Sequence, residues 1–408
     1  MRKVFFGFGA ILVLALPAAA SADVYDVVPG ALANNDNVCQ LVEAVAVSNS
    51  DTPNANDCPI ATAGPDTINL TGGTYSNFNA LNVGDPTSGD MLTIQRSTPT
   101  PVTLTATNDR VMLVLLNTAG VTLNGVTVSG AAVASGGYGG GIQVQSTLVM
   151  NNSVVSGNSI GDANNFGYGG GIVAQNNPAI SVTLTNTTVS GNTASTDGGG
   201  IRMIGAGTLN LDNVTIANNT ANSDNDSLAV PPGDGGDGGG LWVAANVDLH
   251  IRNTIIAGNH QLGDTSTDCL GMGEGGVTSA GGNVIGANTA GCDFVPTATD
   301  HVGNPLLGPL QDNGGPNGFT HAIGPGSIAL DNGVNTGPCP ATDQRGLPRP
   351  FPGTACDSGA FEYQVPPSPP PAAAGPTGQR AAALKKCKKK KSKKARKKCK
   401  KKALVLPV

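Results

Sequence analysis

The sequence predicts an all-β protein, a single-stranded right-handed parallel β-helix (a solenoid) in which successive coils of the chain stack on one another. Five segments share one alternation of apolar and polar residues, and a triple-glycine motif recurs between them. Alternation with a period of two indicates β-strands. Short strands that repeat without any helical pattern between them favour stacked coils over alternating strands and helices.

The composition supports the same fold. The chain has 58 Gly residues but only 9 Phe, 5 Tyr and 1 Trp, and 12% of its residues are charged. Large side chains are too few for a compact core, so order must come from a repeating backbone. A composition rich in Gly and polar residues also suits disorder, but the periodic Val, Ile and Leu residues argue against it.

The repeat defines the coils. Each copy ends in a motif such as Thr188-Val189-Ser190-Gly191-Asn192, and the copies span residues 121–130, 148–158, 182–192, 209–219 and 249–259. The triple glycines at 139–141, 169–171, 198–200 and 238–240 supply sharp turns. One apolar residue of each copy serves as an anchor: Val128, Val155, Val189, Ile216 and Ile256, with spacings of 27, 34, 27 and 40 residues. The extra residues precede the triple glycine, so we expect loops of different length on one side of the stack.

Two sets of asparagines keep a fixed distance from the anchors. One set lies three residues before an anchor, at Asn152, Asn186, Asn213 and Asn253, and the other lies three residues after, at Asn158, Asn192, Asn219 and Asn259. In parallel coils about 4.8 Å apart, each set becomes a column whose side-chain amides can bond to one another. We therefore predict two Asn ladders that stabilise the stack.

The chain is expected to have six parts. Arg2 and Lys3 precede an apolar run that ends in Ala20-Ser21-Ala22, a pattern typical of an export signal. A membrane anchor is the alternative, but the run is short for about 20 spanning residues. The predicted parts are a signal peptide (1–22), an N-terminal cap (23–65), the β-helix (66–300), a C-terminal cap (301–363), a Pro-rich linker (364–379) and a Lys-rich tail (380–408). We expect a mature chain that starts at Asp23, has no transmembrane segment and is a monomer outside the cell or at its surface.

Charge separates the body from the tail. Residues 23–362 hold all 28 acidic residues and six basic ones, a net charge of −22, whereas residues 380–408 hold 15 basic residues and no acidic one. Such dense like charge favours an open, disordered chain. Because a basic run attracts polyanions, the predicted partner is an anionic envelope polymer; a solvated tail with only nonspecific attraction is the alternative. The export signal and the lack of interleaved aromatic residues argue against intracellular nucleic acid.

The eight cysteines fall into four pairs that are local in sequence. An even number of cysteines in an exported chain favours disulfides, and none of these pairs has the C-x-x-C spacing of a zinc site. The predicted pairs are Cys39 with Cys58, Cys269 with Cys292, Cys339 with Cys356, and Cys387 with Cys399.

Three stretches resemble a known group of bacterial secreted β-helix proteins. Residues 39–44, Cys-Gln-Leu-Val-Glu-Ala, are similar to the CSLREA motif at the start of such proteins, with four of six letters matching. The Gly-Gly-Gly-Ile and Ser-Gly-Asn repeats are similar to those of polymorphic outer-membrane proteins. Residues 305–310, 312–316, 343–346 and 357–362 resemble the closing segment called choice-of-anchor Q. The resemblance covers residues 24–363 and implies a right-handed β-helix at the cell surface, with no established reaction.

An enzyme is the alternative from a different class, since polysaccharide lyases and glycosidases also use this fold. The residues that directly precede the triple glycines are Tyr138, Tyr168, Asp197 and Asp237. On neighbouring coils the carboxyl groups of Asp197 and Asp237 could lie about 5 Å apart, the separation that retaining glycosidases use. However, Asp beside Gly is common in turns. We therefore favour a non-catalytic protein and keep these two aspartates as the catalytic alternative.

A ligand-binding column is predicted one residue beyond the start of each strand that follows a triple glycine. It comprises Gln143, Val173, Arg202 and Trp242. We expect these side chains to point outward, with an exposed Trp242 within about 6 Å of Arg202, the range of a cation–π contact. Exposed aromatic rings stack on sugars, so the predicted ligand-binding residues are Tyr138, Tyr168, Arg202 and Trp242. The alternative is that Trp242 covers the stem of Arg202 or packs under the long loop.

Other polar residues suggest little chemistry. Asp212 and Arg252 predict a surface ion pair worth about 0–1 kcal/mol. The four histidines share no spacing, so we predict no metal and no cofactor; residues 233–238 resemble a calcium-binding Gly-Asp repeat but occur once, which leaves calcium unsupported. The sequence thus predicts a non-catalytic binding, adhesion or structural protein directed at polysaccharide or the cell envelope.

Overall fold

The structure is a computed structural model of the whole chain. It describes residues 23–30, 37–50, 57–59, 64–76, 79–85, 89–162, 165–175, 180–222, 238–261, 268–271, 277–286, 291–292, 294–334, 339–350, 355–364 and 378–406. The predicted signal peptide, most of the Pro-rich linker, Asp237 and most of the calcium-like segment lie outside these ranges. The chain forms two compact units, residues 1–363 and 364–408.

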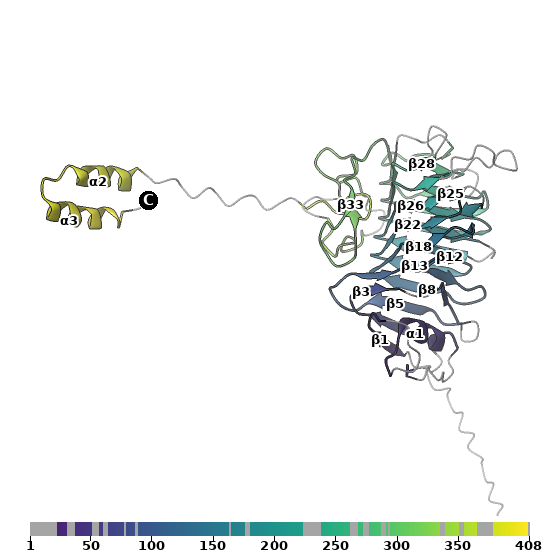
Figure 1. Cartoon of the computed structure of the whole chain (residues 1–408). Coiled ribbons are helices and arrows are strands. Elements are labelled where there is room, and N and C mark those ends of the chain that lie inside the picture. Colours follow the sequence, from purple (N-terminus) through teal and green to yellow (C-terminus); the bar gives the residue numbers. More distant parts are fainter. Residues whose placement is uncertain are drawn as a thin grey trace, which may run out of the picture. The chain divides into compact units, whose positions relative to one another are not determined.

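The first unit is a right-handed parallel β-helix, as predicted (Figure 1). Each full coil contributes one strand to each of three long parallel sheets, here called A, B and C. Sheet A contains β1 (Val24–Val27), β2 (Thr67–Leu70), β5 (Leu92–Arg96), β8 (Val121–Asn124), β13 (Thr147–Asn151), β18 (Ile180–Thr185), β22 (Gly207–Asp212), β26 (Val247–Arg252) and β30 (Val277–Ser279). Sheet B contains β3 (Gly73–Tyr75), β6 (Val102–Leu104), β9 (Val126–Ser129), β14 (Val154–Ser156), β19 (Thr188–Ser190), β23 (Thr215–Ala217), β27 (Ile255–Ala257), β31 (Val284–Ile285) and β32 (His301–Val302).

The remaining strands form sheet C and three shorter sheets. Sheet C contains β4 (Leu81–Val83), β7 (Met112–Val114), β12 (Ile142–Val144), β17 (Ile172–Ala174), β21 (Ile201–Met203), β25 (Leu241–Val243) and β29 (Cys269–Leu270). A sheet between B and C contains β10 (Ala132–Val133), β15 (Ser159–Ile160), β20 (Thr193–Ala194), β24 (Thr220–Ala221) and β28 (His260–Gln261). The two remaining pairs are β11 (Gly137–Tyr138) with β16 (Gly167–Tyr168), and the antiparallel β33 (Leu310–Gln311) with β34 (Thr320–His321).

The register confirms the predicted stacking. The five anchor residues pair coil to coil in sheet B, Val128 with Val155, Val189, Ile216 and then Ile256. All five are fully buried and form one continuous interior row. The strands of sheet A show the same rule: β18 alternates buried and partly exposed residues along its whole length. The hydrophobic core is therefore a column of Val, Ile and Leu inside the coil.

The N-terminal cap is built around a helix. Helix α1 (Leu41–Ser48) contacts β1, β2 and β4 with its apolar side. A capping box starts the helix: the Gln40 backbone N–H donates to the Glu43 carboxylate, and the Gln40 side chain accepts from the Glu43 backbone N–H. The predicted cap (23–65) also contains β1, which already pairs with β2 in sheet A. The stack therefore begins inside the segment that the sequence assigned to the cap.

The predicted C-terminal cap occupies a different place from the one expected. Only its first strand, β32, closes the end of sheet B, where it pairs with β31. The described residues of the rest, 303–334, 339–350 and 355–363, run along the side of the stack and are called the lateral segment below (Figure 1). It bonds to the outer face of sheet B at successive coils: Thr188 Oγ1 donates to Gln344 Oε1 at 2.6 Å, and the Ala360 N–H donates to Thr215 Oγ1 at 2.9 Å. The lateral segment is thus a side support for several coils.

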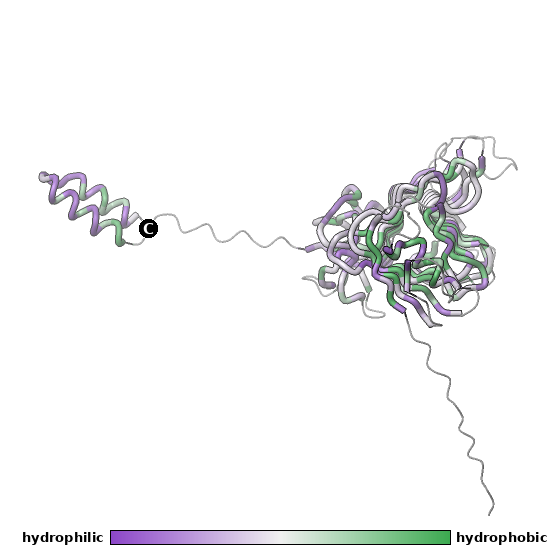
Figure 2. The backbone as a smooth tube through the Cα atoms, turned by 60° about the horizontal axis from the view of Figure 1, so that its bottom comes forward, coloured by the Kyte–Doolittle hydropathy of each residue, from purple (hydrophilic) through white to green (hydrophobic). Residues whose placement is uncertain are grey.

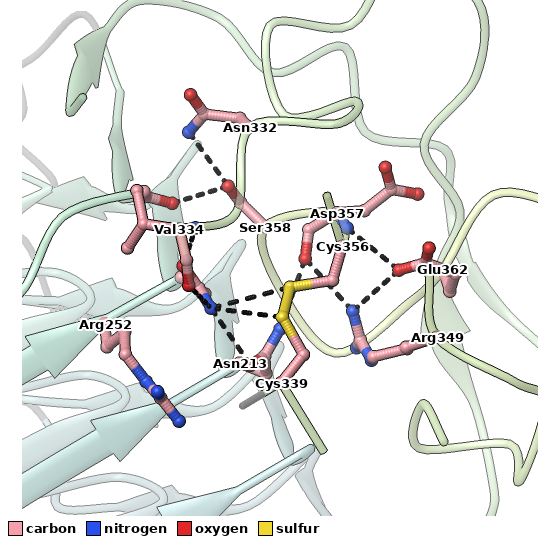
Figure 3. The surroundings of a disulfide bond; sticks show 12 residues. Asn213, Arg252, Asn332, Val334, Cys339, Arg349, Cys356, Asp357, Ser358 and Glu362 are labelled. Carbon is pink, nitrogen blue, oxygen red and sulfur yellow. Dashed lines mark hydrogen bonds and ion pairs between the residues drawn. A yellow bond between two sulfur atoms is a disulfide. The ribbon is translucent and has the colours of Figure 1, made fainter. Parts of the chain in front are cut away.

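The interior of the lateral segment is charged. Arg349 pairs with Glu362 at 3.0 Å, and both side chains are almost fully buried. The guanidinium also donates to the backbone oxygens of Asp357 (3.0 Å) and Gly359 (2.7 Å). Figure 3 shows Arg349 between Glu362 and Asp357, next to the Cys339–Cys356 disulfide. Residues in the stretches that resemble choice-of-anchor Q therefore supply a buried polar network.

Because Asp357 in this network is protonated in the folded state, we predict that the stability of the fold depends on pH. Burial raises the pKa of Asp357 to about 7; Glu362 adds to the rise, whereas backbone N–H donors from Asp331 and Tyr363 and the charge of Arg349 oppose it. The folded state therefore holds a proton that the unfolded state releases near pH 4. The raised pKa of Asp357 therefore stabilises the fold fully below about pH 4. This stabilisation, about 4 kcal/mol of the free energy of unfolding, is lost as the pH rises through 7.

The measurement is chemical unfolding of the wild type and of Asp357→Asn from pH 4 to 8. We expect the free energy of unfolding of the wild type to fall with pH relative to that of the variant. Burial lowers the pKa of His321, so this residue acts in the opposite direction and stabilises the fold as the pH rises toward about 6.5. The comparison with Asp357→Asn cancels that term. Parallel pH profiles of the two proteins would contradict the prediction.

Four disulfides join the cysteines in the predicted pairs: Cys39–Cys58, Cys269–Cys292, Cys339–Cys356 and Cys387–Cys399. The first three lie in the β-helix unit, and the fourth lies in the second unit. Disulfides of this kind persist in oxidising compartments. Among the described residues, no helix is long and apolar enough to cross a membrane.

The second unit holds more regular structure than the open chain that charge repulsion predicted. Helix α2 (Gln379–Lys388) and helix α3 (Lys393–Ala403) form a hairpin joined by the Cys387–Cys399 disulfide. Ser392 caps α3 by accepting the Ala395 N–H, and lysines in the last turn of both helices face the negative end of the helix dipole. Figure 2 shows that the hairpin is mostly hydrophilic, with hydrophobic positions on a limited part of it.

Candidate functional site

One of the two predicted Asn columns forms a continuous ladder. Asn158 Nδ2 donates to Asn192 Oδ1, Asn192 to Asn219, and Asn219 to Asn259, each at 2.9 Å. Each Nδ2 also donates to the backbone oxygen of an earlier coil, and each Oδ1 accepts a backbone N–H from the coil before it. The ladder ends on the buried carboxylate of Asp268, which accepts from Asn259 at 3.1 Å. All four asparagines are fully buried, so the column is structural.

The other Asn column serves the backbone and the lateral segment. Asn152, Asn186, Asn213 and Asn253 have φ between 45° and 54°, the left-handed conformation at the turn from sheet A to sheet B. Side-chain bonds join only neighbours at its two ends, Asn186 to Asn152 at 3.3 Å and Asn253 to Asn213 at 3.5 Å. Asn186 and Asn213 instead donate to the backbone oxygens of Thr342 (2.7 Å) and Asp357 (3.2 Å). The prediction of a ladder here is wrong as a continuous chain, because the turn directs these amides toward the lateral segment.

The predicted ligand-binding residues form one stack. Tyr138 and Tyr168 pair in register, and their rings stack at 5.5 Å. The Arg202 guanidinium carbon lies 4.2 Å from the Tyr168 ring centre and 4.6 Å from that of Trp242. Arg202 also pairs with Asp197 at 3.2 Å. The structure thus brings together the residues that the sequence predicts to bind a ligand, and their side chains contact one another.

The stack is less exposed than predicted. Gln143, Val173, Arg202 and Trp242 do align along sheet C, but Arg202 is only 8% exposed and Trp242 is partly buried. The predicted cation–π contact between Trp242 and Arg202 is confirmed. The predicted exposure is wrong because the triple-glycine turns lie over this face: a Cβ on Gly198 would approach Arg202 Cβ to 2.6 Å. Burial lowers the pKa of Arg202, and the charge of Asp197 opposes this shift. The geometry matches the alternative in which Trp242 covers Arg202.

The catalytic alternative receives no support from Asp197. Asp197 is only 3% exposed, and its carboxylate pairs with the buried Arg202, so it lacks the access that a nucleophile or general acid needs. Asp237 lies outside the described residues. The Asp212–Arg252 pair does form, with Arg252 Nε donating to Asp212 at 3.0 Å. Within the described ranges, no group of three or more His, Cys, Asp or Glu side chains could hold a metal ion.

Open grooves lie elsewhere. The first, called the sheet B groove, has a volume of about 270 Å³ and lies between the lateral segment and the outer face of sheet B. Its floor contains Thr103, Thr127 and Val154, and its wall contains Asp312 and Phe319. Sequence reasoning missed this site because the floor and the wall are about 200 residues apart in the chain. Its one sequence signal was the Asp312–Pro316 stretch, which was assigned to a cap.

Two further grooves contain charged residues. A groove of about 330 Å³ on the outer face of sheet A is lined by residues that include Thr183, Asn210, Asp212, His250 and Arg252. Its ion pair and its amide and hydroxyl groups come from three successive strands. In the second unit, the tail groove has a volume of about 560 Å³, and all of its lining residues are cationic: Lys388, Lys393, Arg396, Lys397 and Lys400.

No family model matches the chain, and no curated protein matches it. Among solved structures, it is similar to the crystal structure of pectate lyase Pel9A, with 15% identity and a TM-score of 0.41 over 84% of this chain and 96% of that one.

Proposed function

We propose that the protein is an extracellular, non-catalytic binding protein of the cell surface, held on an anionic envelope polymer by its C-terminal hairpin. It would belong to the β-helix proteins with a CSLREA-like start and a choice-of-anchor Q-like segment, in which the basic hairpin takes the place of other anchors. The observation that carries the proposal is the tail groove. Five cationic side chains line it, and no acidic residue occurs anywhere in residues 380–408.

The hairpin concentrates charge better than an open chain. Lys393, Arg396, Lys397 and Lys400 lie at spacings of three and four residues along α3, so they share one side of that helix. Lys388 comes from α2, and the Cys387–Cys399 disulfide ties the two helices. Cations fixed around one groove can contact successive anionic groups of a polymer and release several counterions at once. Such binding is steeply salt-dependent.

In this proposal the β-helix unit has a binding or structural role and no catalytic one. Its best candidate for catalysis, Asp197, is paired with Arg202 and covered. A reducing-sugar release assay on polysaccharides is the check on this part. We expect no product; release that Asp197→Asn abolishes would instead favour the polysaccharide-processing alternative.

Charge reversal tests the anchor. Changing Lys393, Arg396, Lys397 and Lys400 to Glu should release the protein from envelopes of the producing cells at about 0.15 M salt, whereas the wild type should stay bound there and elute only at about 0.5 M. The matched control changes Lys386, Lys390, Lys394 and Lys401 to Glu, which alters the net charge equally but leaves the groove lining intact. The measurement is sedimentation with washed envelopes.

Two outcomes would contradict the anchor. Equal release of the two variants would show attraction by net charge alone, without a groove site. Retention of a variant that lacks residues 380–408 would place the anchor elsewhere in the chain. Mass spectrometry of the intact Cys387–Cys399 disulfide in both variants checks that the hairpin closure is kept.

A further inference from the structure

We propose that the sheet B groove binds one pyranose unit of a glycan. The proposal deepens the binding role proposed above, but it concerns the β-helix unit and not the tail. Phe319 forms one wall and is 51% exposed, although large apolar side chains elsewhere in the unit are mostly buried. A ring held at the edge of a groove can cover the C–H face of a sugar. Phe319 is therefore the predicted stacking residue.

The polar lining suits sugar hydroxyls. Thr103 and Thr127 are paired in register on β6 and β9, and Ser129 and Ser156 are paired in the same way on β9 and β14. Their outward side chains line the groove as two rows of hydroxyls. The two hydroxyls of each row are one strand spacing apart, and the rows are two residues apart along β9. Asp312 adds an exposed carboxylate on the wall, and its Oδ1 accepts the Gly314 N–H. The hydroxyls can donate hydrogen bonds to the hydroxyl groups of a sugar and accept hydrogen bonds from them, and the carboxylate can accept them, while the aromatic ring covers the apolar face of the sugar.

The wall is held rigidly before any ligand arrives. Gln344 Nε2 donates to the backbone oxygens of Asn317 and Phe319, each at 3.1 Å. Asn317 Nδ2 donates to the Gln344 oxygen at 2.6 Å, and Arg96 Nη2 donates to Asn317 Oδ1 at 2.7 Å. Arg345 adds a bond to the Asn313 oxygen at 3.1 Å. Because β5 and the network of the lateral segment both hold this loop, the position of Phe319 over the floor is preorganised.

One glycine sets the closeness of wall and floor. Gly318 has φ of +75°, and a Cβ there would approach Thr127 Oγ1 to 2.7 Å and Val154 Cγ2 to 2.9 Å. No other residue type allows the loop to approach β9 and β14 this closely. A volume of about 270 Å³ lies just below the usual range for ligand pockets, about 300–1,000 Å³. The groove therefore fits one sugar unit, at the end of a glycan or within it.

The test is saturation-transfer NMR on the full chain with the neutral methyl glycosides of glucose, galactose, mannose and N-acetylglucosamine. Neutral probes avoid the cationic tail, so a failure here leaves the anchor proposal untouched, and a failure of the anchor leaves this one untouched. We expect at least one glycoside to bind. Phe319→Ala should weaken that binding by at least about tenfold, and Asp312→Asn by about tenfold.

The matched control is Phe166→Ala. Phe166 is 52% exposed, nearly the same as Phe319, but does not line the groove. The Phe166→Ala variant should bind the glycoside as the wild type does. Binding that survives Phe319→Ala, or that Phe166→Ala weakens equally, would overturn the proposal. Failure of all four glycosides, with binding of an apolar dye that Phe319→Ala removes, would also overturn it and would identify a purely apolar patch.

Discussion

Arg349→Leu is expected to lower the free energy of unfolding by about 3–5 kcal/mol, the cost of leaving one member of a buried ion pair without its partner. Arg349 bonds to the Glu362 carboxylate and to the Asp357 and Gly359 backbone oxygens, and it also donates to Asn186 on the stack at 3.3 Å. Its loss would leave Glu362 buried and uncompensated. The side support on sheet B should loosen with it. Chemical unfolding measures the total effect, and hydrogen exchange in residues 303–363 measures the loosening.

Arg252→Leu is the matched control. Arg252 also pairs with a carboxylate, Asp212, but both side chains are partly exposed on the outer face of sheet A. Such a pair contributes about 0–1 kcal/mol, so this variant should unfold almost as the wild type does. A similar loss in the two arginine variants would mean that burial does not govern the strength of these pairs, and the view of the lateral segment as a buried support would fail.

Asn219→Leu is expected to cost at least about 3 kcal/mol. The side chain makes four bonds in the ladder: Nδ2 donates to Val189 O and Asn259 Oδ1, and Oδ1 accepts from Asn192 N and Nδ2. Leucine would leave several of these buried groups unpaired, at about 1–3 kcal/mol for each. It would also interrupt a chain of amides that polarise one another. Thermal and chemical unfolding provide the measurement.

The control uses the same substitution in the same coil. Asn210 lies on the outward side of β22, partly exposed, and donates once, to Thr183 Oγ1 at 3.1 Å. Asn210→Leu should change stability by less than about 1 kcal/mol, because water can replace the lost bond. If Asn219→Leu were equally mild, the buried column would add nothing to the stack beyond its backbone pairing.

Periodicity in the sequence was enough to determine the coil, its interior row and one ladder. Val155, Val189, Ile216 and Ile256 follow an alternation that only a stacked strand satisfies, and backbone pairing then makes every equal offset a column. The ladder from Asn158 to Asn259 follows directly. The four disulfides were predictable on a different ground, because each joins cysteines that are close in sequence. These features depend on the spacing of residues along the chain, which can be read directly from one sequence.

The exposure and the partners of residues on the outer surface depend on contacts between segments that are distant in the chain. Only the tertiary structure determined these contacts. Whether Arg202 is exposed depends on the turn that covers it, and the fate of Asn186 and Asn213 depends on a segment about 150 residues further on. The lateral segment has no repeat, so nothing in its own sequence tells which face it covers. Only its fold against sheet B placed Phe319 over Thr103 and Thr127, because a groove between two segments exists only once both have packed.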